Sequence, residues 1–150
     1  MDTSETYIKM CEKAEEIQND YNKDNWKEWD YCYCELMKKI VVISGYEVDA
    51  GYYGHGLGWD NKLIGQTEGC EGQGKHIWLP RQDQLQEMLS QHSLWSKTLA
   101  FEFFLRKEGS YDIKSYAFQF TSMEQLWLAF VMEEKYNKVW NGENWIKEIE

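Results

Sequence analysis

Residues 121–136 restrict the fold more than any other segment, because they combine a helix start signal with aromatic residues at helical spacing. Thr121 and Glu124 are placed as the N-cap and N3 residues of a capping box, which pairs two backbone N–H groups and is worth on the order of 1 kcal/mol. Five apolar residues then form a broad stripe: Leu126, Trp127, Phe130, Val131 and Tyr136. The sequence therefore predicts an amphipathic helix whose aromatic side lies in a core.

The N-terminal region, about residues 4–22, has a similar periodicity. Its apolar residues recur at spacings of three and four, and charged residues occupy the opposite side. The apolar positions are Tyr7, Met10, Cys11, Ala14, Ile17 and Tyr21. We expect a helix that buries this side, followed by a polar connector over residues 22–29 whose two tryptophan rings pack onto the body of the protein.

Two neighbouring segments favour an antiparallel hairpin. Residues 30–36 alternate in character, with Cys32 and Cys34 on one side, and residues 39–44 are rich in β-branched side chains. In this hairpin the two cysteines face the packed side of the sheet, where cysteine behaves as a small apolar residue.

Residues 75–79 predict a further strand, which leads into Pro80. Proline fits the first position of a helix because the missing N–H would be unpaired there in any case. We therefore place a helix after this strand. Its apolar side consists of Leu85, Met88 and Leu89.

Residues 93–107 fit two kinds of element. Helical spacing is present in Leu94, Trp95, Thr98, Leu99 and Phe103, whereas Phe101, Phe103 and Leu105 alternate as in a strand. The length of the segment, and the stop at residues 109–110, favour a helix.

The C-terminal segment, residues 139–146, has Asn141 and Gly142 at the centre of a predicted two-residue hairpin turn. This turn places Trp140 and Trp145 on one face as diagonal neighbours. We interpret the pair as a small aromatic clasp that covers the end of the preceding helix.

The order of elements predicts an α+β fold, in which three to four helices pack on a small antiparallel sheet. A chain of 150 residues is expected to form a single domain, residues 1–150, because folding at this size removes about two-thirds of the unfolded surface from water. A long Gly-rich excursion is expected at about residues 45–75.

The charge of the chain excludes some partners. It has 26 acidic and 16 basic residues, a net charge of −10, and no basic patch stands out. Because nucleic-acid binding depends on Lys and Arg that neutralise phosphates, we expect no direct binding to nucleic acid. An acidic surface instead steers a protein toward basic partners. No apolar run approaches the roughly 18 residues of a membrane span, so no membrane association is expected.

The four cysteines, Cys11, Cys32, Cys34 and Cys70, do not indicate a disulfide framework. Residues 1–7 lack the basic and apolar regions of a signal peptide, so a reducing compartment is expected. The C-x-C spacing differs from that of a zinc knuckle, and no second pair of ligands follows at the required spacing. Glycine-rich phosphate-binding motifs are also absent. We therefore expect neither a metal nor another cofactor.

Three blocks of distinctive sequence, near residues 7–18, 76–89 and 120–147, carry a resemblance to known proteins. They contain Met10-Cys-Glu-Lys-Ala-Glu-Glu-Ile-Gln18, Trp78-Leu-Pro-Arg-Gln-Asp-Gln-Leu-Gln-Glu-Met-Leu89 and Thr121-Ser-Met-Glu-Gln-Leu-Trp-Leu-Ala-Phe-Val-Met-Glu-Glu-Lys-Tyr136. On these words the chain resembles a group of small uncharacterised proteins encoded by phages and prophages of Gram-positive bacteria. The resemblance implies a phage or prophage setting and a cytoplasmic location in a bacterial host cell. The group has no assigned activity, so no functional residue is implied.

Our leading interpretation is a non-enzymatic protein-binding module that acts on a host or phage protein. Tyr and Trp often carry interface energy, and the chain has eight Trp and ten Tyr. The proposed binding residues are concentrated in the Gly-rich excursion: Tyr46, Tyr52, Tyr53, His55 and Trp59.

Two alternatives remain. The first is a small metal-dependent enzyme that uses Glu47, Asp49, His55 and Asp60, although short acidic loop residues are more often turn formers and no catalytic motif is present. The second is a phage assembly component, which self-association would favour.

Overall fold

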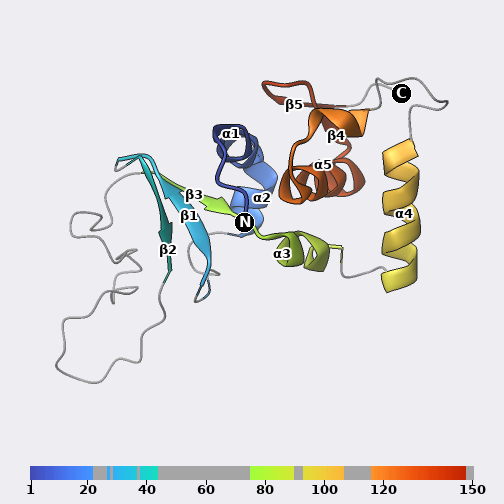
Figure 1. Cartoon of the computed structure of the whole chain (residues 1–150), viewed down its shortest axis with the longest axis horizontal. Coiled ribbons are helices and arrows are strands. Elements are labelled where there is room, and N and C mark those ends of the chain that lie inside the picture. The colour runs from blue at the N-terminus through green and yellow to red at the C-terminus, as the bar shows by residue number, and fades with distance from the viewer. Residues whose placement is uncertain are drawn as a thin grey trace. The chain divides into compact units, whose positions relative to one another are not determined.

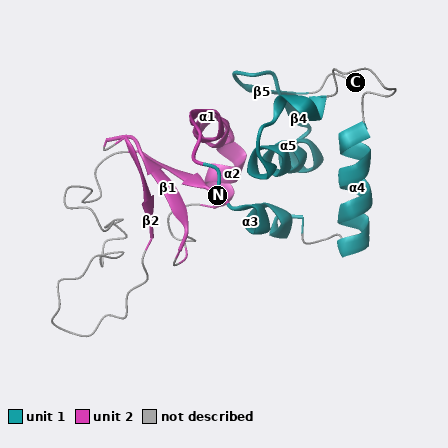
Figure 2. Cartoon of the chain, in the orientation of Figure 1, with its two compact units in different colours: residues 1–2, 81–150 teal, residues 3–80 magenta. Residues whose placement is uncertain are grey.

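The computed structural model of the chain describes residues 1–21, 27, 29–36, 38–43, 75–89, 93–106 and 116–147. These residues form five α-helices, one 3-10 helix, a three-stranded antiparallel sheet and a two-stranded antiparallel sheet (Figure 1). The predicted α+β class is confirmed. The chain divides into two compact units (Figure 2). We call Thr3–Pro80 the sheet unit, and Met1–Asp2 with Arg81–Glu150 the helical unit.

The N-terminal helix of the sheet unit is confirmed, but it is broken in two. α1 spans Glu5–Lys13 and α2 spans Glu15–Asp20, and between them Ala14 leaves the helical region with φ −83° and ψ 65°. α1 begins where the Ser4 hydroxyl accepts a hydrogen bond from a backbone N–H of the first turn. Five of the six predicted apolar positions are buried, and the sixth, Tyr21, is half-buried.

The three-stranded sheet contains the three strands predicted in this region. β1 spans Tyr31–Cys34, β2 spans Lys39–Val42 and β3 spans His76–Leu79, in the order β2-β1-β3. β1 and β2 form the predicted hairpin, and β3 pairs with the other side of β1. Cys32 and Cys34 are fully buried, as predicted for a packed face.

A buried aspartate, Asp30, directly precedes β1. Asp30 is fully buried, and its Oδ2 accepts hydrogen bonds from the Tyr21 hydroxyl at 2.9 Å and from the Lys27 backbone N–H at 2.7 Å. Trp29 precedes it with a φ of 71°. The prediction that this tryptophan ring packs onto the body is wrong, since Trp29 is 64% exposed. Its backbone N–H instead donates to the Ile43 carbonyl, so the residue is held through its backbone.

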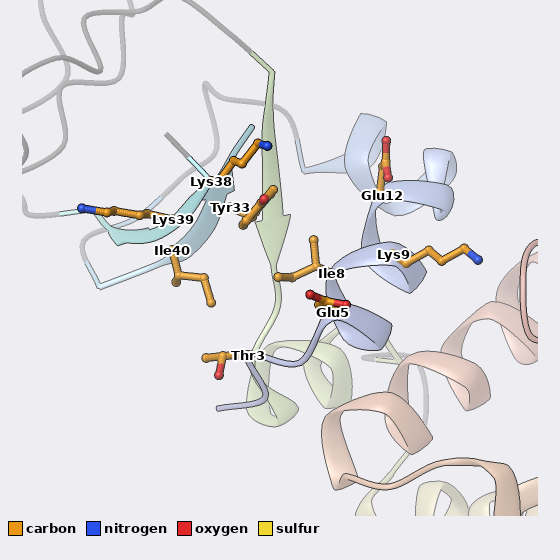
Figure 3. A pocket seen from close by; sticks show the side chains of 9 residues that line it. All are labelled: Thr3, Glu5, Ile8, Lys9, Glu12, Tyr33, Lys38, Lys39 and Ile40. Atoms are coloured by element: carbon orange, nitrogen blue, oxygen red, sulfur yellow. The ribbon is translucent and has the colours of Figure 1, made fainter. Parts of the chain in front are cut away.

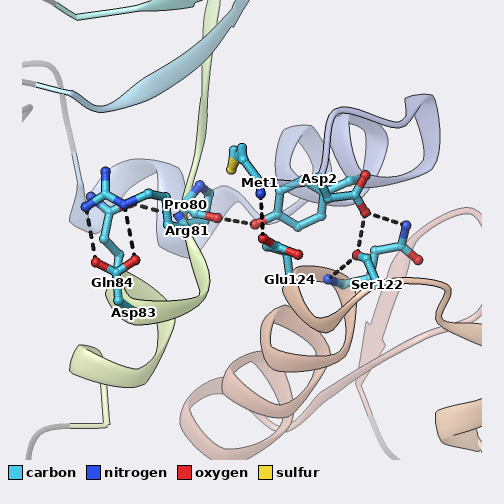
Figure 4. Close-up of polar contacts among 10 residues, drawn as sticks. Met1, Asp2, Pro80, Arg81, Asp83, Gln84, Ser122 and Glu124 are labelled. Atoms are coloured by element: carbon cyan, nitrogen blue, oxygen red, sulfur yellow. Dashed lines mark hydrogen bonds and ion pairs between the residues drawn. The ribbon is translucent and has the colours of Figure 1, made fainter.

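The helical unit continues at Arg81 with α3, which spans Gln82–Glu87. The prediction that Pro80 is the first residue of this helix is wrong, because Arg81 is the N-cap. The Gln84 side chain accepts a hydrogen bond from the Arg81 N–H at 2.8 Å, and this contact fixes the start of the helix (Figure 4). The Arg81 guanidinium also lies 3.1 Å from the Asp83 carboxylate and lowers the pKa of Asp83 below its ordinary value.

α5, which spans Met123–Tyr136, is confirmed as a core helix of the helical unit. Its N-cap is Ser122 and not the predicted Thr121, because the Ser122 hydroxyl accepts the Gln125 N–H at 3.1 Å. The cap thus lies one residue later than predicted, and the Gln125 side chain accepts the N–H of Thr121, the residue before the N-cap, at 3.1 Å. The buried residues extend beyond one stripe: Gln125, Trp127, Leu128, Ala129, Phe130, Val131 and Met132.

The first two residues of the chain lie at the start of α5. The Asp2 carboxylate accepts hydrogen bonds from the Ser122 hydroxyl and from the Gln125 side-chain amide, the latter at 2.7 Å (Figure 4). The Met1 amino group lies 3.2 Å from the Glu124 carboxylate. A negative charge near a helix N-terminus is favourable, so Asp2 strengthens the cap that Ser122 provides.

The predicted C-terminal hairpin is confirmed, with β4 spanning Lys138–Trp140 and β5 spanning Trp145–Lys147. Its turn is longer than predicted. Trp140 and Trp145 lie directly opposite each other, not diagonally, with ring centroids 5.0 Å apart. The reason is that the Asn141 side chain accepts two backbone N–H groups of the turn, at 2.9 and 2.8 Å, which closes a four-residue connection.

Candidate functional site

The binding residues proposed from the sequence, in the Gly-rich excursion, lie outside the described residues: Tyr46, Tyr52, Tyr53, His55 and Trp59. The acids of the alternative metal site, Glu47, Asp49 and Asp60, lie outside them as well. Both interpretations stay predictions. Within the described residues, the feature that points most directly to a function is a helix of the helical unit.

This helix, α4, spans Leu94–Arg106 and confirms the helical interpretation of the segment. The Ser93 hydroxyl accepts a hydrogen bond from the Ser96 N–H at 3.2 Å, which pairs one of the free N–H groups of the first turn. In the last turn, Glu102 and Arg106 form an ion pair of 2.7 Å at a spacing of four residues. Local interactions thus support the helix at both ends.

The inner side of α4 packs on α5 and on η2, the 3-10 helix at Tyr116–Gln119. Phe101 stacks on Trp127 with ring centroids 4.4 Å apart and an interplanar angle of 6°. Phe104 is buried and lies against Phe130, with centroids 5.3 Å apart. These rings belong to one aromatic cluster, which consists of Phe101, Phe104, Tyr116, Phe120, Trp127 and Phe130.

Four large apolar side chains of α4 are exposed. Their exposed fractions are 82% for Leu94, 75% for Trp95, 40% for Leu99 and 67% for Phe103. Leu94, in the first turn, lies on the same side of the helix as Phe101, seven residues later, and the other three lie on the outer side. We call Trp95, Leu99 and Phe103 the outer stripe. Trp95, Leu99 and Phe103 follow one another at a spacing of four, which places them as neighbours along one side of the helix.

The outer stripe has the size of the largest exposed apolar patch of a typical monomer. Its exposed apolar area is on the order of 400 Å², if each aromatic residue contributes roughly 150–250 Å² when fully exposed. The largest apolar patch of a typical monomer is about 300–600 Å² and is often functional. Leaving such a side chain in water forgoes about 1.5–3 kcal/mol of burial free energy. The stripe is therefore a patch of the size that is often functional in a monomer.

α4 is apolar on two opposite sides, with Phe101 and Phe104 on one and Trp95 and Phe103 on the other. A helix that is apolar all round is normally buried all round. In α4 the inner side is packed and the outer side is not. The apolar residues on the outer side therefore indicate that this side packs against a second partner.

Two of the three charged residues of α4, Glu102 and Arg106, lie on its outer side, seven residues after Trp95 and Leu99. The Lys97 ammonium donates to the Gln86 carbonyl of α3 at 2.9 Å, and Glu102 and Arg106 pair with each other. Every charged side chain within Leu94–Arg106 thus has a partner. A partner that covers the outer stripe therefore also meets the Glu102–Arg106 ion pair, in which each charge has its counter-charge.

The sheet unit has an open groove of about 730 Å³ between α1 and the β1–β2 hairpin (Figure 3). Ile8 and Ile40 point toward each other across it, with Tyr33 between them, while Lys9 and Lys39 extend away. The groove is lined by carboxylates, ammonium groups and apolar side chains but by no histidine or cysteine.

The described residues show few other chemical features. No three His, Cys, Asp or Glu side chains among them are arranged to hold a metal ion. Neither does any helix in this part of the chain combine the length and the apolar character needed to cross a membrane. Comparisons with known protein families, with curated proteins and with solved structures find no match to this chain.

The outer stripe was present in the sequence pattern but was not recognised as a site. Leu94, Trp95, Leu99 and Phe103 indicate a helix, and the last three form its exposed outer side. The available signal was that residues 94–106 have large apolar side chains on all sides, which is unusual for a helix that packs on one side only.

Proposed function

We propose that this chain is a non-enzymatic protein-binding module, in which the outer stripe of α4 docks into an apolar groove of a host or phage protein. One observation carries the proposal: α4 packs Phe101 and Phe104 inside the helical unit and exposes Trp95 and Phe103. Helix-in-groove recognition uses large apolar anchors at spacings of three and four residues. Tryptophan is among the residues that most often dominate interface energy.

The charge of the chain supports a partner whose groove is bordered by Lys and Arg. The net charge of −10 steers association toward a basic surface, and the charged residues of α4 are Lys97, which donates to the Gln86 carbonyl, and the ion pair of Glu102 with Arg106. In this proposal the apolar contacts provide the affinity of the complex, and the acidic surface raises the rate of association with the partner. We further propose that the partner lies in the cytoplasm of a bacterial host cell, the location expected for a phage or prophage protein.

Affinity capture from bacterial extracts, followed by reconstitution with the purified captured protein, tests the proposal. The test variants are Trp95→Ser and Phe103→Ser. The matched control is Phe118→Ser, since Phe118 is 76% exposed but lies in η2. We expect each test variant to weaken the reconstituted complex by at least about 30-fold, as the loss of an interface anchor of about 2 kcal/mol does, and the control to bind like the wild type.

A partner that binds the wild type and both α4 variants equally would show that the outer stripe is not the docking surface. The Gly-rich excursion then becomes the surface to test, with Tyr52→Ala and Tyr53→Ala as the variants. We expect these tyrosine variants to leave the thermal midpoint nearly unchanged. A complex that they weaken, and that the α4 variants leave intact, would place the protein-binding function at the excursion.

A further inference from the structure

The three-stranded sheet has one closed edge and one open edge. At the β3 edge, the side-chain amide of Gln18 pairs with the backbone N–H and carbonyl of Trp78, each at 3.0 Å. The other edge is β2, which among the described strands pairs with β1 alone (Figure 1). Backbone groups that point outward from an edge strand are a template for an added strand. The β2 edge can therefore accept a further strand.

Ile40 and Val42 direct their backbone polar groups out of the sheet. The next residue, Ile43, directs its groups inward, because its N–H donates to the Asp30 carbonyl at 2.8 Å and its carbonyl accepts the Trp29 N–H at 2.6 Å. In an antiparallel sheet the backbone groups of successive residues alternate between the two sides of a strand. Ile40 and Val42 therefore point outward, and within the described part of the chain neither has a hydrogen-bond partner at the outer edge.

The open edge borders the groove between α1 and the β1–β2 hairpin. Ile40 and Val42 are two residues apart in the strand, so their side chains lie on the same face of the sheet. On this face Ile40 lies across the groove from Ile8, with Tyr33 between them, and all three are half-buried (Figure 3). A strand added beside β2 places every second side chain on this face, next to Ile40. Apolar residues at those positions would continue the lining of the groove.

Two lysines without a counter-charge stand at the start of β2. Lys38 and Lys39 are exposed and line the groove, and neither has an ion pair or a side-chain hydrogen bond within the described ranges. Lys38 has a φ of 52°, in the left-handed region that Gly and Asn adopt more readily than lysine. Residues held in this region are often found where a site binds a ligand. The hairpin end of the groove thus offers two positive charges.

The carboxylates of the groove lie on its α1 side. The Glu12 carboxylate is paired with Lys75, whose ammonium also lies 3.3 Å from Glu35. Glu5, in the first turn of α1, is exposed, and Lys9 extends away from the groove on the same helix (Figure 3). The hairpin end is therefore locally basic although the chain has a net charge of −10. More distant charges are screened beyond about 8 Å at physiological ionic strength.

We propose that β2 binds an extended segment of a partner protein, which pairs with Ile40 and Val42 as a fourth strand of the sheet. The segment has apolar residues at alternate positions, toward the groove, and an acidic residue against Lys38 and Lys39. Main-chain hydrogen bonds provide the affinity of such a complex, and alternate side chains provide its specificity. β2 offers only two outward-facing residues, so the segment is short and its binding is reversible. This surface goes beyond the proposed function, because it lies in the sheet unit and does not involve the outer stripe.

The first test uses the wild-type full chain. A library of displayed peptides of random sequence, selected on the immobilised protein, supplies the probe, and amide hydrogen exchange with the tightest peptide is followed by NMR. With the peptide at about ten times its Kd, exchange of the Ile40 and Val42 amides should slow about tenfold, since they are free only in the unbound fraction. The Val41 amide faces β1 and should change little. A selection without any binding peptide, or a complex that leaves the Ile40 and Val42 amides unchanged, would overturn the inference.

The second test compares variants with the same peptide, after circular dichroism has checked that they fold. Ile40→Pro removes an outward N–H, and proline is tolerated in an edge strand at such a position. It should weaken binding by at least about tenfold, whereas the control Ile40→Val should bind like the wild type. Lys39→Glu should weaken binding about fivefold, and the control Lys9→Glu, on α1, should not. If Ile40→Pro does not fold, the exchange measurement on the wild type decides.

The outcomes also separate this surface from the outer stripe and from self-association. A peptide that Ile40→Pro binds normally and Trp95→Ser does not bind would lie on α4, which overturns the β2 site and supports docking through the outer stripe. A dimer of the wild-type chain that Ile40→Pro abolishes would assign the β2 edge to a second copy instead of a partner segment. A peptide lost in Ile40→Pro and retained in Trp95→Ser supports the β2 site and leaves the proposed function to the capture experiment.

Discussion

Gln18 pairs with the backbone of Trp78 through both ends of its side-chain amide. Its Nε2 donates to the Trp78 carbonyl at 3.0 Å, and its Oε1 accepts from the Trp78 N–H at 3.0 Å. A neighbouring strand would offer the same two groups, so a residue of α2 takes the place of a further strand beside β3. The Gln18 Nε2 also donates to the Cys11 carbonyl at 3.1 Å and so joins α1 to the same edge.

Replacement of Gln18 by leucine should lower the free energy of unfolding by about 1–3 kcal/mol, because it leaves the N–H and carbonyl of the buried Trp78 without their partner. Urea unfolding followed by tryptophan fluorescence measures the change. The control is Asn19→Ala at the exposed neighbouring position, for which we expect a change within about 0.5 kcal/mol. Equal effects of the two substitutions would contradict a role of the Gln18 amide in the sheet.

Phe103 and Phe104 are adjacent in sequence, but their truncation should lower the stability of the fold by very different amounts. Phe104→Ala removes a buried ring of the aromatic cluster and should cost about 3–5 kcal/mol of stability. Phe103→Ala changes an exposed residue of the outer stripe and should cost less than about 0.5 kcal/mol in a monomer. Thermal or urea unfolding of dilute protein compares them. A large cost at Phe103 in the dilute, monomeric protein would show that its ring is packed in the folded monomer.

Tyr21→Phe should lower the free energy of unfolding, because it removes a hydrogen bond to the buried carboxylate of Asp30. The Tyr21 ring stacks on Trp78 with centroids 3.7 Å apart, and phenylalanine preserves that contact. The substitution therefore removes only the hydroxyl that donates to Asp30 at 2.9 Å. Hydrogen bonds to charged groups contribute about 1.5–3 kcal/mol, and we expect a loss in that range by urea unfolding. Tyr31→Phe, at a half-buried position of β1, serves as the comparison. A loss no larger than that of Tyr31→Phe would rule out this contribution.

Lys75 should contribute stability that disappears at high pH. Its ammonium lies 2.6 Å from the Glu12 carboxylate and 3.3 Å from that of Glu35, and the hydrogen bond with Glu12 raises the pKa of Lys75 above its ordinary value. A raised pKa in the folded state gives stability that is fully present below the ordinary lysine pKa of about 10.4 and is lost as the pH rises through the folded-state pKa.

The side chain of Lys75 is half exposed, so we expect Lys75→Met to cost only about 0.2–1 kcal/mol at neutral pH. The difference from the wild type should shrink in strongly alkaline solution, as urea unfolding at several pH values can show. Lys39→Met, at an exposed position of β2, should show no such pH dependence. A difference that grows with pH would contradict the sign of the shift.

The periodic elements could be predicted from the sequence because the spacing of apolar residues is a local property. The boundary of α5 could not. Thr121 with Glu124 and Ser122 with Gln125 are competing capping pairs one residue apart. The second pair is adopted in the structure, in which Gln125 also donates to Asp2. That contact joins residues 123 positions apart, which no local pattern contains.

The outer stripe could not be identified from the sequence for a similar reason, since contacts between distant residues decide which side of α4 is packed. The pattern of residues 94–106 identified a helix, but the side that packs is decided by Phe101 and Phe104 meeting Trp127 and Phe130 from α5. Until that contact is known, Trp95 is as reasonable a core residue as Phe101. The aromatic residues of the Gly-rich excursion remain a prediction from composition.

The hydrogen bond between Asp2 and Ser122 spans 120 residues of chain, and this gives folding during synthesis a fixed order. At roughly 5–20 residues per second, Asp2 leaves the ribosome on the order of ten seconds before its partner. The sheet unit is contiguous, so it can fold during that interval, whereas the helical unit waits for α5. During that interval Met1 and Asp2, which belong to the helical unit, are synthesised but have no partner at the start of α5.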